Sequence, residues 1–92
     1  MALVSRQGNL GVVVFRDGRL YEGLLENNIR QGEGLFVLPD KSWFYGEFSN
    51  DKKDGFGTEL NSRYRYQGQY VNGMKHGNGV LVEGGTTYIG EW

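Results

Sequence analysis

The chain contains no cysteine and a single proline among its 92 residues. The absence of cysteine excludes disulfide staples and removes the ligand that soft metal ions prefer. A domain of this size without disulfides needs very regular packing, a metal or a partner to be comfortably stable. We therefore expect one small domain whose packing is unusually regular.

Long apolar runs and an excess of charge of one sign are also missing. No apolar run is longer than the four residues from Val12 to Phe15, which is far too short to span a membrane. The residues from Met1 to Gln7 are too few for a secretory signal. The formal net charge is −1, so no global field favours nucleic acid or an anionic membrane. These features predict a cytoplasmic protein that binds no nucleic acid.

Glycine and aromatic residues are abundant, and they recur at fixed positions. Sixteen glycines are present, and 14% of the residues are aromatic. One phrase appears four times: an aromatic residue, any residue, Gly, any residue, and a bulky apolar residue. The copies begin at Tyr21, Phe44, Tyr66 and Tyr88, so the spacing is 22 or 23 residues. Such a period is typical of one supersecondary unit that is copied and stacked.

Each copy is predicted to form a β-hairpin. Aromatic and β-branched residues favour strands, and positions 1, 3 and 5 of the phrase share one face because strand side chains alternate. Asn at position 7 and Gly at position 12 are expected to bracket a polar turn, as in residues 50–55. The glycines that recur at the repeat period are interpreted as structural. They are Gly23, Gly46, Gly68 and Gly90 at position 3, Gly32, Gly55 and Gly77 at position 12, and Gly34, Gly57 and Gly79 at position 14.

The predicted fold is all-β: an elongated, curled, single antiparallel sheet of stacked hairpin repeats. Eight strands are expected, near residues 10–15, 19–25, 33–38, 43–49, 56–60, 64–71, 79–82 and 86–92. The whole chain forms one array in this interpretation. It divides into a lead-in (1–9), a half repeat (10–20), three full repeats (21–43, 44–65 and 66–87) and the start of a fourth (88–92).

These residues resemble the MORN repeat (membrane occupation and recognition nexus). That pattern runs roughly Tyr-x-Gly-x-Trp, a polar Asn-Gly turn, Gly-x-Gly and a turn like Pro-Asp-Gly. The third copy, from Tyr66 to Val80, matches it best, and the resemblance extends from about Gly11 to Trp92. It implies a scaffold or interaction module with cytoskeletal, ciliary or membrane-skeleton settings. It also implies phosphoinositide binding, which the balanced charge supports only weakly.

Candidate catalytic and metal-binding residues are few. His76 is the sole histidine, its position holds Gln31 and Asp54 in the other repeats, and one histidine without cysteine cannot build a zinc site. The Gly-x-Gly pairs lack the helix-opening context of a nucleotide-binding loop. No serine has a base or a nucleophile-elbow context beside it. We predict a non-enzymatic protein without cofactor or metal.

The aromatic row is expected both to form the core and to line a shallow groove. A single-layer sheet can cover one face only by curling, and exposed rings are what partners use as anchors. The predicted partner is a protein segment or subunit. The predicted groove residues are Tyr45, Tyr66, Tyr70, Tyr88 and Trp92.

Basic residues near the third repeat suggest further contacts. Alternation would place Arg63 and Arg65 on one face and Tyr64 and Tyr66 on the other. Arg63, Arg65, Lys52 and Lys53 could meet an anionic head group or an acidic partner. The strand that contains Trp92 leaves an open edge, which a further segment, a second copy or a partner could pair with. A lipid-surface module and a regulatory segment of a larger enzyme remain the alternative functions.

Overall fold

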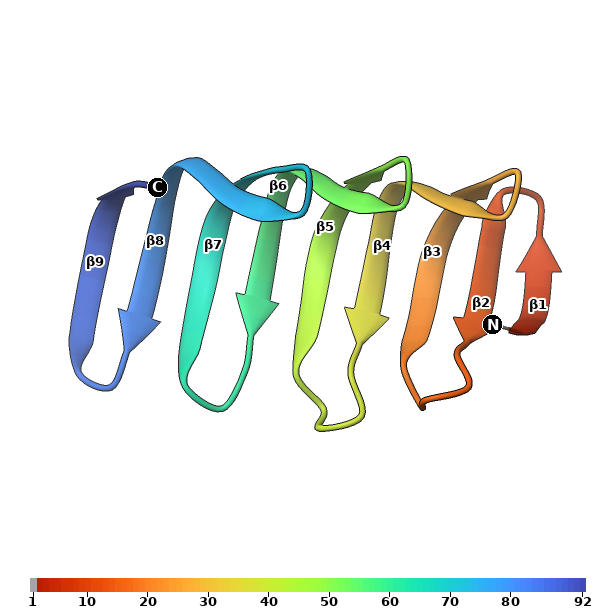
Figure 1. Ribbon diagram of the computed structural model, residues 1–92, viewed down its shortest axis with the longest axis horizontal. Coiled ribbons are helices and arrows are strands. Elements are labelled where there is room, and N and C mark those ends of the chain that lie inside the picture. Colours follow the sequence, from red (N-terminus) through yellow and green to blue (C-terminus); the bar gives the residue numbers. More distant parts are fainter. Residues whose placement is uncertain (1) are drawn as a thin grey trace.

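The sheet is a simple meander in which each strand pairs with the next strand in the sequence (Figure 1). The computed structural model describes the backbone of residues 2–92 and the side chains of residues 7–92. Nine antiparallel strands lie side by side in a body of 40 × 24 × 17 Å. They are β1 (Ala2–Gln7), β2 (Leu10–Val14), β3 (Leu20–Glu26), β4 (Ile29–Val37), β5 (Trp43–Ser49), β6 (Lys52–Leu60), β7 (Tyr64–Val71), β8 (Met74–Glu83) and β9 (Thr86–Glu91). The predicted all-β, single-sheet, stacked-hairpin architecture is therefore confirmed.

Two details of the strand prediction were wrong. The described chain has nine strands rather than eight, because Ala2–Gln7 of the expected lead-in pairs with β2. The predicted polar turn of residues 50–55 is also much shorter, since the turn is only Asn50-Asp51. Both turn residues have positive φ (50° and 71°), which Asn and Asp tolerate and which matches the twist of a two-residue hairpin.

The residues beyond this turn form a bulge instead of a loop. Gly46 pairs with Gly57 and Phe48 pairs with Lys53, so the single residue Glu47 lies opposite three residues of β6. Gly55 takes φ +108° there, and the Glu47 carboxylate accepts the N–H of Phe56 at 2.8 Å. Similar register shifts interrupt the β3–β4 and β7–β8 pairs. A bulge bends the bulged strand and increases its twist, and Figure 1 shows the hairpin tips bending at the upper edge of the sheet.

A row of paired glycines crosses the sheet from β2 to β9. Their successive pairings are Gly11, Gly23, Gly34, Gly46, Gly57, Gly68, Gly79 and Gly90. The ring of Tyr66 lies against Gly68 and Gly79, where an added Cβ would come within 2.6 Å of ring atoms or of the hydroxyl. Glycine is needed along this row because the rings lie flat on the backbone.

The core is a continuous row of rings on one face of the sheet. Each contact is edge-to-face, with centroids 4.9 to 5.4 Å apart, in the order Tyr21, Phe48, Phe44, Tyr70, Tyr66, Trp92 and Tyr88. The ring at position 1 of each repeat thus contacts the ring at position 5 of the next repeat. We call the face that carries this row the ring face, and the opposite one, with Leu35, Val37, Trp43 and Tyr45, the outer face. Edge-to-face contacts of this kind add stabilisation beyond burial of area, so the row joins neighbouring repeats.

Candidate functional site: the ring face and the outer face

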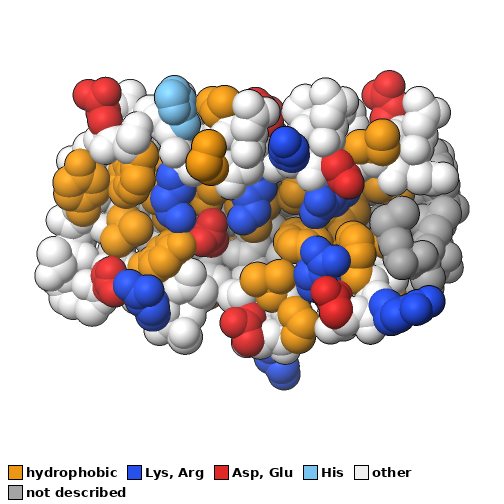
Figure 2. All heavy atoms as spheres, in the orientation of Figure 1, with side chains coloured by type: hydrophobic (Ala, Val, Ile, Leu, Met, Phe, Trp, Pro, Cys, Tyr) orange, Lys and Arg blue, Asp and Glu red, His pale blue; other side chains and the backbone are white. Residues whose placement is uncertain are grey.

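A basic side chain lies over the rings in each full repeat. Arg30, Lys53 and Lys75 occupy the tenth position of their repeats, just after the bent hairpin turns. Arg30 lies 5.0 Å from the Phe48 ring centroid, Lys53 lies 4.9 Å from Phe44, and Lys75 lies 5.2 Å from Tyr66. Figure 2 shows Lys and Arg side chains across the middle of this face, with acidic side chains among them. The tips therefore cover the ring row with cations that the rings attract.

Arg30 also links the hairpin tip of the first repeat to the hairpin tip of the second. Its Nε contacts the Asp51 carboxylate at 2.7 Å, and the Asp51 N–H donates to the Arg30 carbonyl at 3.0 Å. Burial acts to raise the pKa of Asp51, but the Arg30 hydrogen bonds and charge hold it below its usual value. A second backbone link, from Gly73 N–H to the Lys53 carbonyl at 2.8 Å, joins the next two tips.

Glu59 is the centre of a polar cluster on the ring face. It occupies the position that holds Phe36 in the first repeat and Leu81 in the third. Its carboxylate accepts hydroxyl hydrogen bonds from Tyr64 and Tyr70, both at 2.6 Å, and lies 3.6 Å from Lys53 and 3.7 Å from Lys75. Burial acts to raise the pKa of Glu59, yet these hydrogen bonds and charges keep it lowered. The cluster is thus an ionised carboxylate satisfied by four neighbours.

Two hollows on the ring face meet at Phe36 and Lys53. One, of about 190 Å³, is lined by residues that include Leu38, Ser42 and Glu59. The other, of about 230 Å³, reaches from Arg19 across Arg30 and Phe48 to Lys52. Both hollows are lined by Phe36 and Lys53, so they are neighbours on the same face, and we call the two together the ring-face groove.

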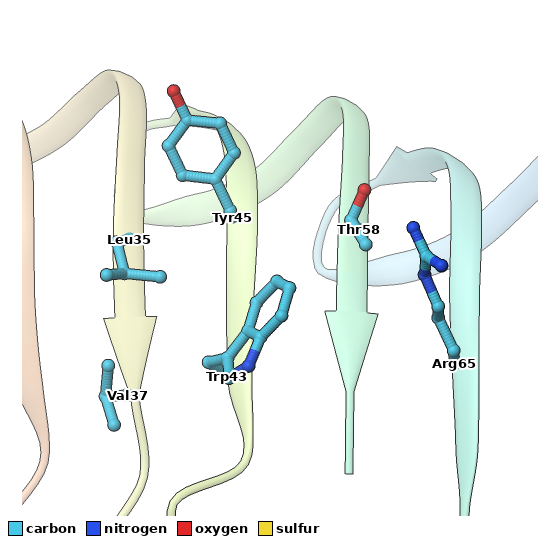
Figure 3. Close-up of a pocket in the computed structure, with 6 residues that line it drawn as sticks. All are labelled: Leu35, Val37, Trp43, Tyr45, Thr58 and Arg65. Carbon is cyan, nitrogen blue, oxygen red and sulfur yellow. The ribbon is translucent and has the colours of Figure 1, made fainter.

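The outer face carries a broader but shallower hollow. It measures about 540 Å³ and is lined by Leu35, Val37, Trp43, Tyr45, Thr58 and Arg65 (Figure 3). The register places these side chains in two adjacent cross-strand rows, with Val37 opposite Trp43 and Leu35 opposite Tyr45. Leu35, Val37 and Trp43 were not among the site residues predicted from the sequence. The sequence did contain a pattern that could have identified them, because they alternate with the ring-face residues along β4 and β5.

The five predicted groove residues lie in three different environments. Tyr66 and Tyr70 are buried in the ring row, with 0% and 2% exposure, so neither offers a free surface to a partner. Tyr88 and Trp92 lie at the β9 edge and are partly exposed. Tyr45 is exposed on the outer face, because it directly follows Phe44, whose ring lies on the ring face, and adjacent side chains of a strand point to opposite faces. The structure therefore does not bring the five residues together into one groove.

The predicted basic contacts are also dispersed. Lys52 and Lys53 line the ring-face groove, whereas Arg65 lines the outer hollow. Arg63 precedes β7 and lies 3.3 Å from the Glu83 carboxylate. The predicted alternation holds for Tyr64 and Tyr66, which both pack on the ring face opposite to Arg65. These four basic residues form no common anion site.

Other kinds of site have little support in the described part of the chain. Within it, no three His, Cys, Asp or Glu side chains are grouped closely enough to hold a metal ion. The described residues also include no helix long and apolar enough to cross a membrane. His76 is an exposed residue of β8.

Comparison with known proteins identifies the repeats. The family model described as MORN repeat matches residues 21–43, 44–61 and 66–82, which is more than half of the chain. The chain is 32% identical over 79 residues to Alsin from Mus musculus and to Alsin from Homo sapiens, covering 78% of this chain and 5% of each relative. It is 29% identical over 94 residues to Alsin from Rattus norvegicus, covering 89% of this chain and 6% of that protein.

The chain thus spans about one twentieth of the length of these relatives. The MORN repeat is a non-catalytic repeat module that points to interaction with proteins or membranes. The matched segments contain the bent hairpin tips, the ring row from Tyr21 to Tyr66 and the glycine row from Gly23 to Gly79. The chain belongs to the MORN repeat family.

Proposed function

We propose that the chain is a non-catalytic docking module that binds an extended segment of a partner protein in the ring-face groove. The observation that carries this proposal is the pair of neighbouring hollows that share Phe36 and Lys53, between the hairpin tips and the opposite loops of the sheet. Apolar groups (Phe36, Leu38) and both signs of charge (Lys53, Glu59) meet there. At protein interfaces an anchor side chain commonly fills a desolvated apolar pocket, and charged groups around it fix the register of the partner.

The repeat spacing suits an extended chain that crosses the strands. Neighbouring repeats are two strands apart, which is about 9.6 Å. A partner segment in the polyproline II conformation advances about 9.3 Å per turn of three residues, so every third side chain points the same way and would meet an equivalent position of the array. We expect an apolar side chain of the partner in the Phe36 hollow, with polar residues between the anchors.

A pair of variants on opposite faces tests this proposal. Leu38→Asp places a charge in the ring-face groove, and Tyr45→Asp places one on the outer face. Both residues are substantially exposed, so both variants should keep the β-sheet circular dichroism of the wild type. Partners captured by the wild type should be lost by Leu38→Asp and kept by Tyr45→Asp. Loss with Tyr45→Asp alone would move the docking surface to the outer face.

A cytoskeletal or ciliary setting is part of the same proposal. It rests on the family resemblance and not on a feature of this chain. Imaging of a tagged chain with the Leu38→Asp variant as control tests it, because the docking-deficient variant should become diffuse. A diffuse wild type would contradict that setting.

Binding to phosphoinositide is the less favoured alternative. Arg30, Lys53 and Lys75 lie in line on the ring face, but each has a carboxylate partner in Asp51 or Glu59. The chain would have to break these pairs to hold a head group. Flotation with phosphoinositide liposomes at physiological salt, compared with Lys53→Gln/Lys75→Gln, separates this alternative from protein docking, because a head group on the ring face needs these two cations. A role as a regulatory segment of a larger enzyme is tested by binding of the chain to that enzyme's catalytic domain.

A further inference from the structure

The outer face carries apolar residues where an exposed sheet face normally carries polar ones. When one face of an antiparallel sheet forms the core, the other face usually alternates to polar side chains. Here one cross-strand row from β2 to β8 is apolar at every position but one. In order, its residues are Val14, Leu20, Val37, Trp43, Leu60, Arg65 and Val82. A contiguous exposed apolar surface of this kind marks an interaction site.

Two charged residues of this face have no partner inside the chain. Within the described residues, neither the Arg65 guanidinium nor the Glu22 carboxylate makes a hydrogen bond or an ion pair. The cross-strand neighbours of Arg65 are Leu60 and Val82, and those of Glu22 are likewise apolar. Both charges are therefore available to a group outside the chain.

These features are placed symmetrically about β5. Glu22 lies on β3 and Arg65 lies on β7, so each is two strands away from β5, on opposite sides of it. One strand away on either side, Leu35 of β4 and Thr58 of β6 both pair with Tyr45. Figure 3 shows the Tyr45 and Trp43 side chains of β5 between these two strands. A negative and a positive charge, and a larger and a smaller side chain, thus lie at matched positions around one strand.

We propose that the outer face binds the outer face of a second copy of the chain, with a two-fold axis along β5. A two-fold interface has to be self-complementary, because the same patch of both copies forms it. Rotation about this axis places β3 of each copy over β7 of the other, and β4 over β6. The Glu22 carboxylate of each copy then meets the Arg65 guanidinium of the other. Leu35 of each copy fills the hollow above Thr58 of the other.

The dimensions of the face suit such a dimer. The body measures 40 × 24 Å across this face, which offers up to about 960 Å², and a standard specific interface buries about 800 Å² per copy. Glu22 and Arg65 belong to adjacent cross-strand rows, which are about 6.7 Å apart along the strands. The long side chain and planar fork of arginine suit a carboxylate at such an offset.

The remaining carboxylates near the hollow do not compete for Arg65. Glu33 and Glu47 pair with each other one row closer to the bent hairpin tips. The Tyr45 hydroxyl contacts Glu33 at 3.4 Å, and Glu47 accepts the N–H of Phe56 at 2.8 Å. Both carboxylates therefore lie at the rim of the proposed interface. The ring-face groove is on the opposite side of the sheet, so this proposal and the docking proposal can fail separately.

A charge exchange tests the dimer. In sedimentation equilibrium, the 92-residue chain should form a dimer with a dissociation constant in the micromolar range or tighter. Arg65→Glu and Glu22→Arg each place like charges together at both symmetric contacts, so each should weaken the dimer at least about tenfold. The double variant restores opposite charges and should return to within about threefold of the wild type. Both residues are exposed, so circular dichroism should show the same β-sheet in all variants.

Two further variants locate the contact. Tyr45→Asp places two charges beside the two-fold axis and should leave the chain monomeric. Lys52→Glu is the matched control, because it reverses a charge that lines the ring-face groove, and it should leave the dimer unchanged. A wild type that stays monomeric at about 1 mM would overturn the proposal.

Three other results would also overturn it. The first is a double variant as weak as its parent single variants, since the two charges would then not meet. The second is a dimer that Tyr45→Asp leaves intact, since the copies would then meet elsewhere, for example at a sheet edge. The third is a monomeric chain whose capture of a different protein is lost with Tyr45→Asp, since that protein would then occupy the outer face.

Discussion

Tyr70 of β7 donates its hydroxyl hydrogen to the Glu59 carboxylate of β6 at 2.6 Å. Burial and the adjacent carboxylate raise the pKa of Tyr70, so the phenol remains a neutral donor. Because the acceptor is charged and partly buried, this bond contributes more than an ordinary surface hydrogen bond.

Tyr70→Phe keeps the ring and removes only the hydroxyl. We expect the free energy of unfolding to fall by about 1–3 kcal/mol, since hydrogen bonds to charged groups fall in that range. Urea denaturation measures the change. Tyr45→Phe is the matched control, because the exposed Tyr45 hydroxyl contacts Glu33 only at 3.4 Å. Similar losses for the two variants would show that the Glu59 bond has no special role.

Glu59→Leu restores the apolar character found at the equivalent Phe36 and Leu81 positions, but it should still destabilise the chain. The change leaves Lys53 and Lys75 without their carboxylate and two tyrosine hydroxyls without their acceptor. We expect a loss of about 1–3 kcal/mol by denaturant unfolding. Adding Tyr64→Phe, Tyr70→Phe, Lys53→Met and Lys75→Met should recover much of it, because no polar group is then left unpaired. Failure to recover would mean that the cluster does not account for the loss.

The stability conferred by Glu59 should depend on pH in the acid range. Its pKa is lowered in the folded chain from the ordinary value of 4.5. When folding lowers the pKa of a group, the group contributes its full stabilisation at pH values above its pKa in the unfolded chain. It loses that stabilisation as the pH falls through its pKa in the folded chain. The difference in unfolding free energy between wild type and Glu59→Gln should therefore be constant near neutrality and shrink below about pH 4.5. A difference that stayed constant down to pH 2 would contradict the lowered pKa.

The glycine row predicts a position-specific response to a single methyl group. Gly57→Ala places a Cβ against the Phe44 ring and should cost about 1–3 kcal/mol through overpacking, measured by thermal or urea unfolding. Gly85→Ala is the control, because no atom lies within 4 Å of a Cβ at that turn position. Equal tolerance of the two substitutions would indicate that the rings do not lie on the glycines as described.

The sequence predicted the repeat, the strand pairing and the ring face, because these follow from a short-range pattern copied four times. It did not predict the bulges. Whether the residues from Asn50 to Gly55 form a loop or a tight turn with a bulge depends on the tertiary contacts of Glu47 and Lys53, which no local pattern reveals.

The site was predicted less well than the fold, for a related reason. A periodic pattern identifies which rings share a face, but not which of them the bent tips cover. Tyr66 and Tyr70 are buried because Lys53 and Lys75 fold back over the row, and this depends on the bulges. Tyr45 belongs to the outer face by strict alternation, so its place could have been read from the sequence.

The continuous ring row that joins one repeat to the next is the central claim, and nuclear Overhauser contacts between aromatic protons test it most directly. The account predicts cross-repeat contacts for Tyr21–Phe48, Phe44–Tyr70 and Tyr66–Trp92, whose ring centroids are 5.4, 5.0 and 4.9 Å apart. Aromatic contacts found only within repeats, such as Phe44–Phe48 and Tyr66–Tyr70, would contradict it.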